Sequence, residues 1–320
     1  MKKRKLIITQ NLDDHLIEKI HNVVPDWEVI IGQDQNIWEE HLHSAEVIAG
    51  WKKQIKEACK SNDTSIRWVQ AWSAGVNSLP LGLLKDRNIS VTSANGVHAY
   101  PISKTIFALI LGLTRNIHTY VKNQQAKTWH HANLKLEIHQ KTIGIIGVGA
   151  IGKETAKIAK AFGMEVLGVR NSGIPSEYVD NMYSSDQLNE ILPLCDFVVV
   201  TLPLTKDTTY LFGRDQFKQM KNTGVFINIG RGQIVVENEL IDALQIGEIA
   251  GAGLDVFETE PLQPDTPLWN MDNVIVTPHT AGATEHYDKR VIEDIFIPNF
   301  KKYVQDKPMP VNLLDFNKGY

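Results

Sequence analysis

Short apolar runs separated by amphipathic segments fill the chain from its start to about residue 98. Five runs have the length and β-branched or aromatic content of buried parallel strands: Leu6–Thr9, Trp27–Ile31, Glu46–Ala49, Trp68–Ala71 and Ile89–Thr92. Between the first two, apolar positions from Leu12 to Val24 recur at the spacing of one helix face. The alternation predicts a small α/β unit without a phosphate loop of its own.

A second pattern begins near residue 101. The spacing predicts a long helix from about Pro101 to Val121, since proline suits a first turn and apolar residues recur from Ile106 to Leu113. From about 141 to 280, strands and helices alternate again. The strand runs are Val166–Val169, Phe197–Thr201, Val225–Ile229, Ala250–Asp255 and Val274–Val276, and the helical runs are Asp186–Leu192, Arg214–Met220 and Glu237–Gly247.

A last helical pattern from Thr284 to about Val304 is long enough to return the chain to its first unit. We therefore predict an α/β protein with two doubly wound parallel-sheet domains. A Rossmann nucleotide domain, residues 99–287, is inserted into a smaller flavodoxin-like substrate domain, residues 1–98 and 288–320. Two helices would cross between them.

The segment Lys141–Gly163 carries the most specific local signal. An apolar run precedes glycines spaced G-x-G-x-x-G, and a helical pattern follows them. The first glycine permits the tight turn, the second lets a pyrophosphate approach the backbone, and the third lets helix pack on strand. The pyrophosphate would lie on the helix N-terminus. The residues expected around it are Gly147, Gly149, Ala150, Ile151 and Gly152.

The composition limits the partners. At 320 residues with 43% hydrophobic content, the chain can form two ordinary globular domains, and its net charge of −4 argues against nucleic acid or an anionic membrane. The apolar stretch Leu6–Ile8 is too short for a signal peptide or a membrane span. Cys59 and Cys195 lack metal-site spacing, so we expect reduced thiols, no metal and a cytoplasmic protein.

Three residues with useful chemistry follow predicted strands of the second unit: Arg231, Glu260 and His279. Arginine can bind a carboxylate bidentately, and histidine can exchange a proton near neutral pH. A neighbouring carboxylate would orient the ring and favour its protonated form. Singly, they read equally well as a surface cation, a cap and a loop histidine. Together they suit hydride transfer at a carbon beside a carboxylate.

The chain resembles the D-isomer-specific 2-hydroxyacid dehydrogenase family, and within it the glyoxylate/hydroxypyruvate reductase branch. The resemblance covers nearly the whole chain through five motifs: GVGAIG (147–152), TLPLT (201–205), NIGRG (228–232), GLDVFETEPL (253–262) and TPHTAG (277–282). It implies that Arg231, Glu260 and His279 are the catalytic triad. It also implies a homodimer joined through the nucleotide domains.

The resemblance implies further contacts. Asp255 would hold the nicotinamide carboxamide, and the backbone at Leu202, Pro203, Ile229 and Gly230 would line the cofactor. The loop Ser73–Asn77 matches the family's carboxylate-binding loop, in which the N–H groups of Ala74, Gly75 and Val76 would meet the substrate, together with Arg231. Trp51, in a loop after a predicted strand, would either roof the pocket or belong to the core.

The cofactor preference depends on one short stretch. NAD enzymes of this architecture place an acidic residue roughly 20 residues past the glycines, on the ribose 2′-hydroxyl. Here that position holds Arg170, followed by Asn171 and Ser172, with no acid before Glu177. A guanidinium can bind a 2′-phosphate, so we predict NADP(H) over NAD(H), which stays possible. The alternative is that Arg170 caps a strand and points to solvent.

The sequence therefore predicts reduction of a small 2-oxo acid to the D-2-hydroxy acid, with the proton from His279. Glyoxylate or hydroxypyruvate would be preferred over branched or aromatic acids. Two alternatives stay open at this point. One is a nucleotide-sensing, corepressor-like protein on the same fold, and the other is a formate-type dehydrogenase.

Overall fold

The computed structural model describes residues 3–76, 78–131 and 136–316, and its contacts divide the chain into two compact units. Unit 1 comprises Met1–Val97 and Thr284–Tyr320, and unit 2 comprises His98–Ala283. Unit 2 is thus inserted between the two segments of unit 1. The predicted class, two parallel-sheet α/β domains, is confirmed.

Unit 1 contains a five-stranded parallel sheet of order β2-β1-β3-β4-β5, the flavodoxin-like order. Its elements are β1 Lys5–Ile8, α1 Asp14–Val23, β2 Glu28–Ile31, α2 Gln35–Trp38, β3 Val47–Ala49, α3 Lys53–Lys60, β4 Trp68–Gln70, α4 Leu81–Asp86, β5 Ser90–Thr92, α11 Tyr287–Arg290 and α12 Ile297–Tyr303. Apolar clusters fill both faces of the sheet, because the interiors of β1, β3 and β4 are buried between helices. On one face the Trp68 ring stacks on Phe296, with centroids 5.1 Å apart.

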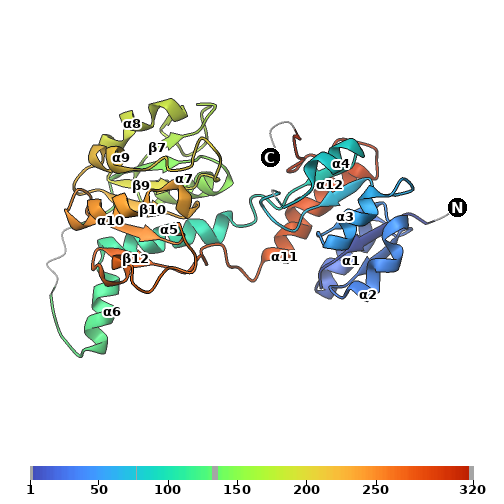
Figure 1. Ribbon diagram of the computed structural model, residues 1–320, viewed down its shortest axis with the longest axis horizontal. Helices are drawn as coiled ribbons and strands as arrows, with labels where there is room; N and C mark the ends of the chain where they lie inside the picture. Colours follow the sequence, from blue (N-terminus) through green and yellow to red (C-terminus); the bar gives the residue numbers. More distant parts are fainter. Residues whose placement is uncertain (1–2, 77, 132–135, 317–320) are drawn as a thin grey trace. The chain divides into compact units, whose positions relative to one another are not determined.

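Unit 2 contains a seven-stranded sheet of order β12-β11-β10-β9-β6-β7-β8, which is the Rossmann order with one added strand (Figure 1). Its elements are α5 Ala99–Thr114, α6 Ile117–Gln125, β6 Thr142–Ile146, α7 Ala150–Ala161, β7 Glu165–Val169, β8 Asn181–Tyr183, α8 Leu188–Ile191, β9 Phe197–Val200, α9 Arg214–Gln219, β10 Val225–Asn228, α10 Glu237–Gln245, β11 Gly251–Leu254 and β12 Val274–Val276. One apolar cluster packs α5 and α7 on one face, and another packs α8 to α10 on the other.

Two helix predictions needed changes. The single helix expected from Pro101 to Val121 is wrong, because α5 ends at Thr114 and α6 starts at Ile117. Asn116 between them has φ 50°, the left-handed conformation that asparagine tolerates at a helix end. The helix expected from Thr284 is present as α11 and α12, joined by a π-helical segment, Val291–Phe296.

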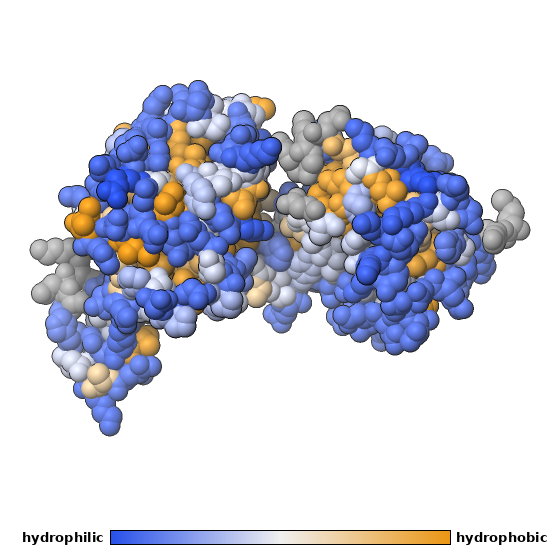
Figure 2. All heavy atoms as spheres, in the orientation of Figure 1, coloured by the Kyte–Doolittle hydropathy of each residue, from blue (hydrophilic) through white to orange (hydrophobic). Residues whose placement is uncertain are grey.

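Hydrophilic side chains cover most of the face shown in Figure 2. No helix in the described ranges is long and apolar enough to cross a membrane. Both cysteines are buried and free. Burial raises the pKa of Cys59 to about 11 and, as the largest of several causes, that of Cys195 to about 12, so both thiols stay protonated and unreactive at neutral pH.

Candidate active site

The glycine turn has the predicted strand–turn–helix geometry. Gly147 has φ +110°, and a Cβ there would lie 3.0 Å from the Leu202 backbone nitrogen. A Cβ on Gly152 would lie 2.5 Å from the Gly147 carbonyl oxygen, so only glycine lets α7 pack this closely on β6. Gly149 faces open space. The first N–H groups of α7, from Ala150 on, have no acceptor inside the helix.

The ends of β6, β9 and β10 meet beside this turn. Leu202 follows β9, and its carbonyl oxygen would lie 2.7 Å from a Cβ on Gly230, which follows β10. The Thr201 hydroxyl donates to the Gly147 carbonyl at 2.6 Å. In this fold the strand order reverses between β6 and β9, where nucleotides bind. The structure therefore brings together the backbone at Leu202, Gly230 and the glycine turn, with Pro203 and Ile229 beside them in sequence.

Arg170 directly follows β7, and Asn171 and Ser172 are exposed beside it. The Arg170 guanidinium has no hydrogen bond or ion pair with any residue that the structure describes. The turn is closed by the backbone, since Gly173 N–H donates to the Arg170 carbonyl at 3.0 Å. Arg170, a cation without a partner among the described residues, thus occupies the position where NAD enzymes carry an acidic residue.

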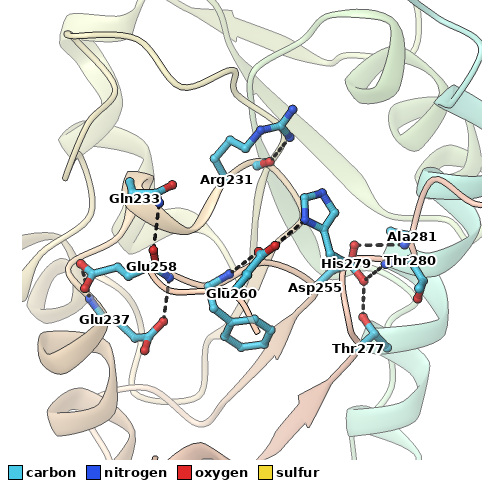
Figure 3. A network of polar contacts seen from close by, with 12 residues as sticks. Arg231, Gln233, Glu237, Asp255, Glu258, Glu260, Thr277, His279, Thr280 and Ala281 are labelled. Carbon is cyan, nitrogen blue, oxygen red and sulfur yellow. Dashed lines mark hydrogen bonds and ion pairs between the residues drawn. The ribbon is translucent and has the colours of Figure 1, made fainter. Parts of the chain in front are cut away.

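His279 and Glu260 form a direct pair beyond β12 and β11 (Figure 3). His279 Nδ1 lies 2.7 Å from Glu260 Oε2, and the imidazole side chain is 49% exposed, so Nε2 can reach a ligand. Burial raises the pKa of Glu260, but the His279 hydrogen bond, the Phe257 N–H and the charges of His279 and Arg231 outweigh it. The pKa of Glu260 is therefore lowered overall. Glu260 is therefore ionised at neutral pH and can stabilise a protonated imidazole.

The backbone that carries His279 is fixed by Asp255. One Asp255 oxygen accepts from the Thr277 hydroxyl at 2.6 Å and from Thr280 N–H at 3.0 Å, and the other accepts from Ala281 N–H at 3.0 Å (Figure 3). The Asp255 carbonyl accepts from His279 N–H at 2.9 Å. These bonds hold His279 at φ 53°, which is unfavourable for a residue with a side chain. Asp255 thus supports the loop, a role the sequence did not indicate.

Arg231 lies in a turn after β10, with its side chain exposed. Its Nη1 donates to the Gly230 carbonyl at 2.6 Å. Buried Asn228 braces this turn by donating to the Arg231 carbonyl at 3.1 Å and accepting from Gly230 N–H at 3.0 Å. Asn228 was not predicted to have a role, although a polar residue ending an apolar strand was a usable signal. The guanidinium stays available for an anion.

The loops that carry Arg231 and Glu260 pack directly on each other. A Cβ on Gly232 would overlap the Phe257 carbonyl group, so this contact requires glycine. Two glutamates reinforce it: Glu258 N–H donates to the Glu237 carboxylate at 3.0 Å, and Glu237 N–H donates to the Glu258 carboxylate at 3.4 Å (Figure 3). The structure thus brings all three predicted catalytic residues to one edge of the unit 2 sheet.

In unit 1, the predicted carboxylate-binding loop follows β4. Within the described residues, the N–H groups of Ala74, Gly75 and Val76 have no hydrogen-bond acceptor. Successive free N–H groups form an anion-binding concavity. Asn77, which the predicted loop included, lies outside the described residues. Trp51 follows β3 and is half-buried against the unit 1 core. Its place in a pocket stays a prediction.

Comparisons with known proteins define the class. Residues 107–281 match the model of the D-isomer specific 2-hydroxyacid dehydrogenase NAD-binding domain. The chain therefore belongs to the D-isomer specific 2-hydroxyacid dehydrogenase family of oxidoreductases, as the sequence motifs predicted.

Particular relatives narrow the likeness to one branch. The chain is 35% identical over 290 residues to glyoxylate/hydroxypyruvate reductase B of Salmonella typhi, covering 88% of this chain and 89% of the relative. A family member from Aeromonas salmonicida has TM-score 0.82 and 29% identity, covering 98% of this chain and all (100%) of that one. The NADPH-dependent glyoxylate/hydroxypyruvate reductase of Sinorhizobium meliloti, in complex with NADP and sulfate, has TM-score 0.78 and 28% identity over 99% and 100% of the two chains.

Proposed function

We propose that this enzyme reduces a small 2-oxo acid of the glyoxylate or hydroxypyruvate type to the D-2-hydroxy acid, with NADP(H) as its preferred cofactor. The observation that carries the proposal is the 2.7 Å pair between His279 and Glu260, with its imidazole exposed at the carboxyl edge of a Rossmann sheet. The names of the Salmonella and Sinorhizobium relatives support the same substrate class.

The chain's own groups suit this chemistry. A bound reduced nicotinamide supplies the hydride that adds to C2 of the substrate. His279 donates its Nε2 proton to the carbonyl oxygen, because Nδ1 is committed to Glu260. Glu260, ionised at neutral pH, stabilises the imidazolium before the transfer. Arg231 binds the substrate carboxylate and stabilises the developing charge on the oxygen.

The N–H groups of Ala74, Gly75 and Val76 would bind the same carboxylate. They are three consecutive donors without acceptors in the described chain, and they need an anion or water. This proposal gives the backbone of unit 1 a recognition role and leaves proton transfer to unit 2.

The residues around the glycine turn fit a dinucleotide. Gly149 offers open backbone, and the α7 N-terminus favours a pyrophosphate. Leu202, Pro203, Ile229 and Gly230 would line the cofactor through their backbone. Asp255 Oδ2 accepts one hydrogen bond from the residues that the structure describes, which leaves an acceptor position for the carboxamide assigned to it by resemblance.

Arg170 carries the preference for NADP(H). Its guanidinium has no partner in the described chain, and exposed Asn171 and Ser172 add neutral donors for a 2′-phosphate. The NADPH dependence of the Sinorhizobium neighbour supports this choice. The homodimer expected through the nucleotide domains and the cytoplasmic location stay predictions.

The deciding experiment follows the absorbance of NADPH, and separately of NADH, with glyoxylate, hydroxypyruvate, pyruvate and phenylpyruvate. We expect higher kcat/KM with NADPH and with the two small acids. Arg170→Asp should erase or reverse the cofactor preference, while Lys157→Asp, the same charge change on the exposed side of α7, should not. No turnover of any 2-oxo acid would favour the nucleotide-sensing alternative. Higher kcat/KM with NADH would exclude the cofactor assignment.

A further inference from the structure

Two polar groups of Trp72, in the loop that follows β4, form hydrogen bonds with residues of α11. The indole Nε1 donates to the Asp288 carboxylate at 2.9 Å, and the Tyr287 hydroxyl donates to the Trp72 carbonyl at 2.8 Å. All three residues are half-buried and belong to unit 1, although Trp72 is more than 200 positions from the other two in sequence. We call these two bonds the Trp72 bracket.

The bracket lies immediately before the free N–H groups of residues 74–76. Ser73, the next residue, is also held in place. Its carbonyl accepts from Ala94 N–H at 2.9 Å, and its hydroxyl donates to the Gly75 carbonyl at 2.7 Å. The loop is therefore held by hydrogen bonds to its carbonyl groups and to the side chains of Trp72 and Ser73. Its next three N–H groups are left without acceptors in the described chain.

The bracket does not serve the sheet itself. β4 ends at Gln70, and the ladder continues only through Ala71 N–H, which donates to the Thr92 carbonyl at 2.7 Å. Apolar contacts already place Trp72 against the cluster that contains Tyr287 and Val97. Two added hydrogen bonds between half-buried groups fix its orientation as well as its position. A fixed orientation is what a row of hydrogen-bond donors needs to bind an anion without reorganising.

We propose that Trp72, Tyr287 and Asp288 are positioning residues that hold the N–H groups of Ala74, Gly75 and Val76 ready for the substrate carboxylate. This inference rests on the proposed function. The three side chains act through the loop and need not touch the substrate. Because a carboxylate is bound in both the ground state and the transition state, loss of the bracket should raise KM for the 2-oxo acid and leave kcat nearly unchanged.

The first test is Tyr287→Phe, which removes one hydroxyl and keeps the ring. We expect KM for the 2-oxo acid to rise about three- to tenfold, the effect of one lost hydrogen bond, with KM for NADPH unchanged. The matched control is Tyr303→Phe. Tyr303 is also half-buried in unit 1, but its hydroxyl donates to Glu46 at 2.8 Å, away from the loop. It should lose stability without changing KM.

A second pair of variants separates hydrogen bonding from packing. Asp288→Asn keeps an oxygen that accepts from the indole, whereas Asp288→Ala removes it. We expect Asp288→Ala to raise KM like Tyr287→Phe, and Asp288→Asn to restore most of the parent value. Equal KM values in the parent, Tyr287→Phe and Asp288→Ala would overturn the bracket while leaving the proposed function intact.

Oxalate separates the two proposals further, because its binding in the presence of NADPH can be measured by calorimetry without turnover. If the parent binds oxalate but reduces no 2-oxo acid, the proposed function fails. Weaker oxalate binding by Tyr287→Phe, and not by Tyr303→Phe, would then still support the bracket. A parent that neither turns over 2-oxo acids nor binds oxalate would overturn both.

Discussion

The carboxyl edges of the two sheets present different kinds of functional group. The edge of unit 2 carries ionisable side chains, Arg231, Glu260 and His279, on loops whose backbones are hydrogen-bonded. The edge of unit 1 carries backbone N–H groups at residues 74–76 that have no acceptor among the residues described, on a loop held by side chains. In unit 2 the side chains are the functional groups and the backbone is held by hydrogen bonds. In unit 1 the backbone N–H groups are the functional groups and side chains hold the loop.

The exchange follows from the chemistry each edge would perform. Proton transfer needs a group that ionises near neutral pH, and only a side chain provides one. Carboxylate binding needs donors in a fixed row, which any backbone provides if it is held still. The unit 1 loop can therefore change its side chain at Ala74 and keep its donors, whereas the Val76 side chain belongs to the buried core. The unit 2 edge cannot replace His279 without losing its chemistry.

The largest effect is expected from His279→Ala. Loss of a positioned general acid should lower kcat about 10²–10⁴-fold, with binding of NADPH largely kept. Steady-state kinetics and cofactor titration measure the two quantities. His130→Ala, which removes another exposed histidine of unit 2, is the control and should have parent activity. Near-parent reduction of 2-oxo acids by His279→Ala would show that the assignment of the proton donor is wrong.

Asp255→Asn should have the next largest effect. The amide presents one donor where both carboxylate oxygens now accept, so at least one of the three loop bonds is lost. A lost bond to a buried charged group costs about 1.5–3 kcal/mol, which corresponds to about 10- to 100-fold in kcat if it displaces His279. The midpoint temperature of thermal unfolding and kcat should both fall. A higher KM for NADPH with unchanged kcat would instead favour the cofactor role alone.

These two residues show what the sequence could and could not predict. His279 and Arg231 were found because residue type, strand-end position and family motif all agree. The supporting role of Asp255 could not be found, because it depends on the register of β11 and β12, which places Leu254 beside Val276. Thr277 was missed for the same reason, because its hydroxyl donates to the carboxylate of Asp255, which is distant in sequence. Asn228 was missed although its hydrogen bonds, to Gly230 and Arg231, are local.

The fold shows a similar limit. Apolar runs predicted every buried strand to within a residue or two, because a run of β-branched residues fits a strand covered on both faces. The missed strand, β8, is Asn181–Tyr183, an edge strand with an exposed or half-buried pattern and no apolar run. The break at Asn116 was also missed, since an apolar helix face continues on both sides of it. The Trp72 bracket joins segments that are distant in sequence, so no local sequence pattern could predict it.

Glu260→Gln tests the electrostatic side of the unit 2 edge. The neutral amide keeps an acceptor for His279 but removes the charge that favours the imidazolium. In the direction of 2-oxo acid reduction, the high-pH limb of the kcat/KM profile should move to lower pH. A pH profile that coincides with the parent's would contradict this coupling.

The same substitution has a stability signature. The folded-state pKa of Glu260 is lowered, so its contribution to the free energy of unfolding is present above the unfolded value of about 4.3. That contribution is lost as pH falls through the lowered folded value. Acid titration of thermal stability should therefore show a smaller loss for Glu260→Gln than for the parent in this range. Side-chain exposure of 36% limits the size of the difference.

The smallest effect concerns Trp51 and the shape of the unit 1 edge. β3 pairs with β4, and Gly50 N–H donates to the Gln70 carbonyl at 2.8 Å, so the loop bearing Trp51 neighbours the loop at residues 71–76. Backbone donors bind a carboxylate without regard to the rest of the acid. Selection by size must then come from a bulky neighbour, and Trp51 is the candidate.

Trp51→Ala should therefore raise kcat/KM for phenylpyruvate relative to glyoxylate by about tenfold, the usual discrimination of a shape-limited pocket. Trp27→Ala is the matched control, because Trp27 is also half-buried but precedes β2 at the opposite end of the sheet. Both variants should lose thermal stability through lost packing, and only Trp51→Ala should change the substrate ratio. An unchanged ratio in Trp51→Ala would assign Trp51 to the core, against which its side chain already packs.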